Sequence, residues 1–148
     1  PRLALTSLPD GLTTINNGAF SHCTKLALTS LPEGITTIGQ NAFLECTQLA
    51  LTSLPDSITS ISYYAFAYCS SLALTSLPDG LTTINNFAFR YCVGLTTITI
   101  GSAIKTIGTT AFEGCTNLKT IIINRAEGTV SGAPWGATNA TVQWVGTN

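Results

Sequence analysis

Residues 26–48 read LALTSLPEGITTIGQNAFLECTQ, and this pattern returns along the chain with a 23-residue period. Further copies of its first seven residues, strict or relaxed, begin at Leu3, Leu49, Leu72, Leu95 and Leu118. One unit of this size is too small to bury an apolar face by itself, so such units stack and share a continuous core. The repeat therefore predicts a solenoid.

Two columns of identical residues keep the 23-residue spacing without an insertion. The aromatic column holds Phe20, Phe43, Phe66, Phe89 and Phe112, and the thiol column holds Cys23, Cys46, Cys69, Cys92 and Cys115. Coils that pair their strands in parallel place identical residues above one another. We therefore predict a structural core with an aromatic spine, in which the cysteines are buried free thiols. Thiols spaced evenly along a rod do not converge on a metal, and their parallel Cβ vectors suit disulfides poorly.

Each unit divides into short elements. In residues 26–48 we predict a strand over 26–31, a turn over 32–34, a second extended piece over 35–38 and a helical or 3₁₀ turn over 41–46. The expected fold class is therefore a mostly β solenoid of short parallel strands and tight turns. Five repeats and a terminal strand occupy residues 1–123, and residues 124–148, where the period is lost, are expected to form a C-terminal cap around Trp135 and Trp144.

The first predicted strand differs between units. The last two units place Ile98 and Ile121 at its fourth position, whereas the first four place a leucine at the third: Leu5, Leu28, Leu51 and Leu74. Moving an apolar residue by one position in a strand reverses the face to which it points. Either the strand bulges and buries these leucines, or they form an exposed apolar stripe and a candidate binding surface.

Composition and charge exclude several functions. Six Lys and Arg residues face seven Asp and Glu residues, without a basic cluster, so no nucleic-acid partner is expected. Apolar runs such as Ile121–Ile123 are too short for membrane insertion.

His22 is next to Cys23, but Cys23 belongs to the core column, so we expect no catalytic pair, enzyme activity, cofactor or metal. The acidic column of Asp10, Glu33, Asp56 and Asp79 is expected to be solvated turn chemistry.

Aromatic residues interrupt the repeat in the third and fourth units. The candidate binding residues there are Tyr63, Tyr64, Tyr68, Phe87, Arg90 and Tyr91. Aromatic rings with arginine are typical of binding hot spots, and stacked tyrosines also suit carbohydrate. The alternative is that these rings only cover the edge of the core.

The Leu-x-x-Ile-x-Ile-Pro and Ala-Phe-x-x-Cys-x-x-Leu patterns resemble the BspA-like leucine-rich repeats of bacterial surface proteins. The match covers Leu3 to Ile123, about four fifths of the chain. The resemblance implies a right-handed leucine-rich repeat solenoid, secretion to the cell surface or the extracellular space, and a role in adhesion or protein binding. It implies no catalytic residues.

Two functions remain open from the sequence. The first is a non-enzymatic module of an exported surface protein that binds a protein or glycan ligand. The alternative is a structural repeat or assembly element of a fibre, filament or phage tail. The chain begins at Pro1 without a signal peptide, so we expect a piece of a longer protein, in which an uncapped N-terminal edge at Leu3–Leu8 would allow self-association.

Overall fold

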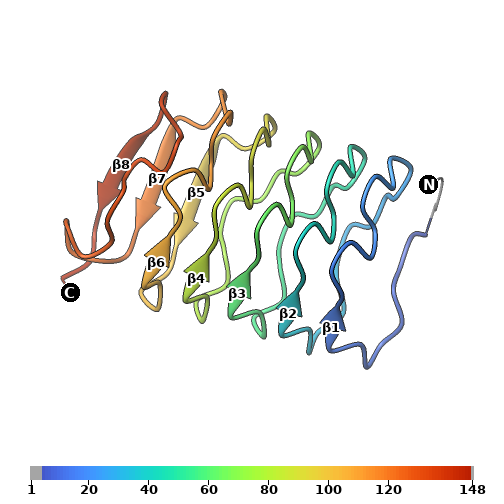
Figure 1. Ribbon diagram of the computed structural model, residues 1–148. Helices are drawn as coiled ribbons and strands as arrows, with labels where there is room; N and C mark the ends of the chain where they lie inside the picture. Colours follow the sequence, from blue (N-terminus) through green and yellow to red (C-terminus); the bar gives the residue numbers. More distant parts are fainter. Residues whose placement is uncertain (1–4, 148) are drawn as a thin grey trace.

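The chain winds as a parallel β-solenoid of about six coils in the computed structural model, which describes residues 5–147 (Figure 1). We number the coils by the repeats that begin at Leu3, Leu26, Leu49, Leu72, Leu95 and Leu118. Leu3, at the start of the predicted N-terminal edge, lies outside the described residues. Within residues 5–147 no helix is long and apolar enough to cross a bilayer.

One side of the rod carries a five-stranded parallel sheet of two-residue strands. Its strands are β1 (Thr14–Ile15), β2 (Thr37–Ile38), β3 (Ser60–Ile61), β4 (Thr83–Ile84) and β6 (Thr106–Ile107). Each residue pairs with its equivalent in the next repeat, as Ile15 does with Ile38. The isoleucine of every strand is buried. This sheet confirms the second extended piece that the sequence predicts in each unit.

The opposite side carries a second parallel sheet only toward the C-terminus. It consists of β5 (Thr97–Ile100), β7 (Thr120–Ile123) and β8 (Thr141–Trp144). In the first four coils the predicted strand over this segment is wrong, because the backbone bends at its fourth position: Thr6, Thr29, Thr52 and Thr75. Residues 26–31 and 49–54 share one backbone hydrogen bond in the described chain, donated by Ala50 N to Leu28 O at 3.4 Å.

The bend determines the position of the leucines at the third position of the predicted strand, which we call the shifted leucines: Leu5, Leu28, Leu51 and Leu74. Leu28 and Leu51 are completely buried and Leu74 is 1% exposed, whereas Leu5 in the first coil is 38% exposed. An exposed leucine stripe along the rod is therefore wrong. The backbone turns Leu28, Leu51 and Leu74 inward at the bend, which preserves the buried apolar surface at the expense of strand pairing.

The predicted helical or 3₁₀ turn is also wrong, because the segment is a run of β-turns. Leu44 N donates to Asn41 O, and Cys46 N donates to Phe43 O, at 3.2 Å each. The N–H groups that alternate with these bond to the next coil instead: Phe43 N donates to Ala65 O, and Glu45 N donates to Ala67 O, at 2.8 Å each. Alternating local and intercoil bonds need residues with positive φ, such as Asn41 at 60° and Glu45 at 59°.

The phenylalanine spine is confirmed as the centre of the core. Consecutive rings from Phe20 to Phe112 stack with centroids 5.3 to 5.5 Å apart and interplanar angles of 10° or less. The four rings from Phe43 onward are completely buried. Burying an aromatic side chain contributes about 1.5–3 kcal/mol, so the spine is a major stabilising element.

The five cysteines are free and buried, as predicted. Four of them also connect coils, because each thiol donates to a phenylalanine carbonyl of the preceding coil. Cys46 Sγ lies 3.0 Å from Phe20 O, and Cys69 Sγ lies 3.1 Å from Phe43 O. Burial raises the pKa of Cys46 and of Cys115 from 9.0 to about 12. The thiols are therefore neutral hydrogen-bond donors at physiological pH.

Residues after Asn124 keep more of the repeat than the sequence analysis predicts. Val130 and Trp135 continue the columns of Ile107 and Phe112 at the 23-residue spacing, and both are buried. Trp135 O accepts the hydrogen bond of Phe112 N at 2.9 Å, and the Trp135 ring packs edge-on against Trp144. Strand β8 then pairs with β7 at a spacing shorter than the repeat. The last coil thus extends the spine with an indole.

Candidate binding site

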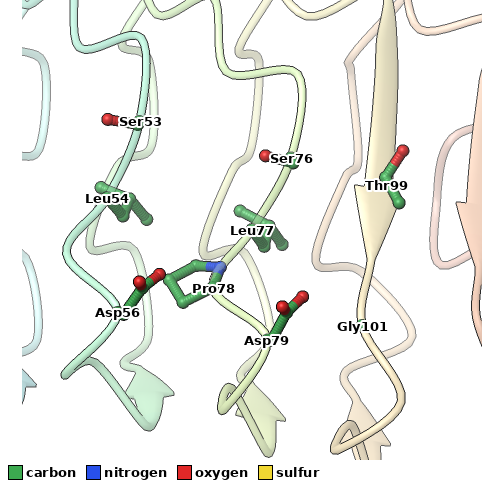
Figure 2. A pocket seen from close by; sticks show the side chains of 9 residues that line it. All are labelled: Ser53, Leu54, Asp56, Ser76, Leu77, Pro78, Asp79, Thr99 and Gly101. Atoms are coloured by element: carbon green, nitrogen blue, oxygen red, sulfur yellow. The ribbon is translucent and has the colours of Figure 1, made fainter.

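Shallow depressions lie between coils on the side of the rod that carries the Leu-Pro segments of the repeats, such as Leu31-Pro32 and Leu77-Pro78. We call this side the Leu-Pro side. Figure 2 shows one depression of about 200 Å³, between the third, fourth and fifth coils, where β5 begins the second sheet. Ser76 bridges to Thr99 there, and Leu77 N donates to Thr99 O at 3.0 Å. Asp56 and Asp79, from neighbouring coils, lie at its lower margin in this view.

These carboxylates belong to the exposed acidic column. Asp10, Glu33, Asp56 and Asp79 are all exposed. No group of three or more His, Cys, Asp or Glu side chains in residues 5–147 is arranged to hold a metal ion. The depression therefore offers serine hydroxyls and screened carboxylates but no convergent set of ligands.

The turns of the third and fourth coils bring together most of the candidate aromatic residues. Tyr64 stacks on Phe87 with ring centroids 4.9 Å apart, and Tyr68 stacks on Tyr91 with centroids 5.2 Å apart. Each pair joins equivalent positions of the third and fourth coils. Parallel coils thus build two adjacent aromatic stacks, which we call the aromatic flank together with Arg90.

Arg90 lies between the two stacks. Its Cζ is 5.2 Å from the Phe87 ring centroid, 5.3 Å from that of Tyr91 and 5.8 Å from that of Tyr68. Its Nε lies 3.2 Å from Glu113 Oε2. The guanidinium thus has three cation–π contacts and one ion pair, and together with the rings of the fourth coil it forms a packed support behind Tyr64 and Tyr68.

A depression of about 430 Å³ lies in front of this support. It is lined by Tyr64 and Tyr68 from the third coil and by four residues of the second coil: Gln40, Asn41, Leu44 and Glu45. Asn41 and Glu45 occupy the positions that the two tyrosines occupy one coil later. The aromatic stacks therefore end at this coil, and polar side chains face the last rings.

Tyr63 lies apart from the aromatic flank, although the sequence analysis groups it there. Tyr63 is 47% exposed and lines a different depression, with Asn85, Asn86 and Thr109 among others. Adjacent residues of a tight turn point in different directions, so sequence neighbours do not share a surface. The shifted leucines also contribute nothing to the flank, because Leu28, Leu51 and Leu74 are buried in the core.

The backbone under the aromatic flank has an unusual conformation. Tyr64, Tyr68, Phe87 and Tyr91 all have positive φ, between 55° and 63°. Elsewhere these columns hold residues that tolerate this region better, such as Gly18, Asn41 and Gly114. The equivalent turns of other coils have positive φ at His22, Asn41 and Glu45. The turn therefore does not require aromatic residues at these positions.

Two polar residues of this surface also form a contact that the sequence analysis misses. His22 Nδ1 contacts Glu45 Oε2 across the first and second coils. His22, Glu45, Tyr68, Tyr91 and Gly114 form one column, so the 23-residue spacing contained the signal that places Glu45 next to Tyr68.

Comparison with known proteins shows similarity to leucine-rich repeat proteins, both in sequence and in structure. The family model described as the BspA type leucine rich repeat region matches residues 2–126 in six copies. A search of the curated proteins finds no match. Among solved structures, the leucine-rich repeat protein TpLRR of T. pallidum is 31% identical, with a TM-score of 0.78, and the alignment covers 95% of this chain and 67% of that protein.

Two further structures show the same architecture. A leucine-rich cell surface protein of Faecalibacterium prausnitzii is 29% identical, with a TM-score of 0.72, covering 96% of this chain and 35% of that one. A leucine-rich repeat protein of Bacteroides ovatus, 24% identical with a TM-score of 0.59, is similar in fold, covering 94% of this chain and 49% of that one. This chain therefore spans about two thirds of the first protein and a half or less of the other two.

Proposed function

Because the chain belongs to the BspA-type leucine-rich repeat family, we propose that it is a non-enzymatic binding module of an exported bacterial surface protein. The aromatic flank is the surface that engages the ligand, which is a protein or a glycan. One of the similar structures is a leucine-rich cell surface protein, which supports the proposed location.

The observation that carries the proposal is the aromatic flank itself. Four aromatic residues adopt positive φ in columns where the other positions with positive φ hold glycine, asparagine, glutamate or histidine. The solenoid core does not need these rings, since the separate Phe column already forms a buried spine. Binding hot spots are enriched in tyrosine and arginine, and every residue of the flank except Phe87 is of one of these types.

The test compares the chain with the variant Tyr64→Ser/Tyr68→Ser/Tyr91→Ser. We expect the labelled chain to bind immobilised mucin, which presents both polypeptide and glycans, and the triple variant to lose that binding while its circular dichroism spectrum is unchanged. Equal binding by both proteins would contradict the use of the aromatic flank.

The assembly alternative is tested by molar mass. Light scattering after size exclusion should give a constant mass near 15.5 kDa over a wide concentration range. Growth into long oligomers would instead favour a fibre or filament element.

A further inference from the structure

We propose that the depression between the second and third coils binds a neutral glycan, with Tyr64 and Tyr68 as the platform for a pyranose ring. This assignment rests on the proposed binding function and specifies its ligand. It also adds Gln40, Asn41 and Glu45, which the sequence analysis did not select.

Tyr64 and Tyr68 both present ring surface to the depression. Tyr64 and Tyr68 are each covered on one side by a ring of the fourth coil, Phe87 or Tyr91. Both also line the depression whose other wall is the second coil. Their surface on the second-coil side is therefore available to a ligand. The C–H groups of a pyranose pack on such aromatic surface, and rings already held by stacking lose little freedom on binding.

The residues of the second coil add polar groups to the lining of the depression. Gln40 and Asn41 offer carboxamides, which both donate and accept hydrogen bonds, and Glu45 offers carboxylate oxygens, which accept them from hydroxyls. A ligand with an apolar face and many hydroxyl groups matches this combination. Leu44 supplies the apolar part of the lining.

The charge of the lining indicates which class of sugar the depression accepts. Glu45 is the charged residue that lines the depression, and its neighbour across the coils is His22. Arg90 does not line the depression, and it pairs with Glu113. An acidic glycan would therefore meet a carboxylate without a lining cation to balance it, which favours an uncharged sugar.

The volume is consistent with this ligand. About 430 Å³ falls within the range of small-molecule sites, roughly 300–1,000 Å³. The depression is bordered by two neighbouring coils and is shallow enough for a chain of sugars to continue beyond it. We therefore expect one or two residues of an oligosaccharide to make the contacts.

The repeat itself supplies variants that preserve the turn. Tyr64→Asn installs the residue that the second coil has at this position, Asn41, and Tyr68→His installs that of the first coil, His22. Both residue types already occupy the same positive-φ turn. The matched control is Tyr63→Gln, which copies Gln40 and removes an exposed tyrosine outside the depression.

The experiment titrates N,N′,N″-triacetylchitotriose, cellotriose, lactose and 3′-sialyllactose into the chain, monitored by calorimetry and by NMR shifts of the tyrosine rings. We expect at least one neutral probe to bind, about tenfold weaker binding in Tyr64→Asn and in Tyr68→His, and an unchanged affinity in Tyr63→Gln. Sialyllactose should bind more weakly than lactose, and Glu45→Gln should narrow that difference.

The assignment is overturned if no neutral probe binds, or if Tyr64→Asn and Tyr63→Gln behave alike. Mucin before and after enzymatic deglycosylation separates this failure from failure of the proposed function. If the deglycosylated polypeptide still binds the chain but not the Tyr64→Ser/Tyr68→Ser/Tyr91→Ser variant, the ligand is a protein. The proposed binding function then stands and the glycan assignment is wrong.

Discussion

The first four coils and the fifth and sixth coils bury similar apolar side chains on the Leu-Pro side, yet they do so with different backbones. In the second coil, Leu26, Leu28 and Leu31 are buried, and the chain bends at Thr29 without forming a strand. In the fifth coil, Leu95, Ile98 and Ile100 are buried, and residues 97–100 form β5.

The spacing of the apolar residues explains this difference. Ile98 and Ile100 are two residues apart, which matches the period of a strand, and β-branched threonines alternate with them. Leu28 and Leu31 are three residues apart, so an extended chain would point one of them outward. The chain therefore bends, which buries both leucines but gives up the hydrogen bonds of a strand in this segment. The Phe and Cys columns, by contrast, run through both halves of the rod.

Alkaline pH should produce the largest effect, because it acts on the shared thiol column. Burial raises the pKa of Cys46 and Cys115 from 9.0 to about 12, so the folded state favours the neutral thiol. The buried neutral thiols therefore contribute their full stabilisation of the folded state below about pH 9, and this contribution is lost as the pH rises toward 12. Thermal unfolding by circular dichroism should show a constant midpoint from pH 6 to 8 and a progressive fall above pH 9.

Both halves should unfold together in that experiment, since the column runs through both. Two separate transitions at alkaline pH would show that the first four coils and the coils that form the second sheet unfold as independent units. The variant Cys69→Ala/Cys92→Ala provides the control, because it should weaken the dependence on pH.

Truncating the spine should have the next largest effect. Phe66 is completely buried between Phe43 and Phe89, with centroids 5.4 and 5.5 Å away. Phe66→Ala should lower the free energy of unfolding by about 3–5 kcal/mol in urea denaturation. Phe112→Ala, in a sheet-forming coil, should fall in the same range. A loss below about 1 kcal/mol in either variant would contradict a common spine.

Exchanging the pattern of one coil tests the bend directly. Leu51→Thr should lower the free energy of unfolding by about 2–4 kcal/mol, because a buried leucine is replaced by a hydroxyl-bearing side chain. Adding Thr52→Ile gives the third coil the apolar spacing of the fifth and should recover at least half of the loss. A double variant no more stable than Leu51→Thr would show that the spacing does not select the backbone.

A glycine substitution gives the smallest effect and concerns the aromatic flank. Gly114 has a φ of 77°, and a Cβ added there would lie 2.6 Å from a carbon of the Tyr91 ring. Gly114→Ala should therefore lower the free energy of unfolding by about 1–2 kcal/mol and displace Tyr91, seen as a shift of its ring NMR signals.

Gly128→Ala is the matched control for this substitution. Gly128 has a φ of 87°, but an added Cβ would have no neighbour within 4 Å, so only the backbone strain remains. It should lower stability less and leave the Tyr91 signals in place. Equal effects of the two variants would mean that Gly114 does not support the aromatic flank.

The sequence by itself determined the period, the stacked coils, the phenylalanine spine and the free thiols, because identical residues at a fixed spacing meet their own copies in any parallel solenoid. It did not determine the backbone between those positions. A strand over 26–31 and a helical turn over 41–46 followed from local patterns, and the structure has a bend and a run of β-turns instead.

Only the tertiary structure decided which side chains share a surface. Tyr63 and Tyr64 are neighbours in the chain, yet Tyr64 faces Asn41 and Glu45 across a depression while Tyr63 lines another. The direction of each side chain depends on the φ of its residue in the turn, and intercoil hydrogen bonds such as the one from Tyr68 N to Arg90 O hold that φ positive. Because those bonds join residues of different coils, no local pattern reveals them.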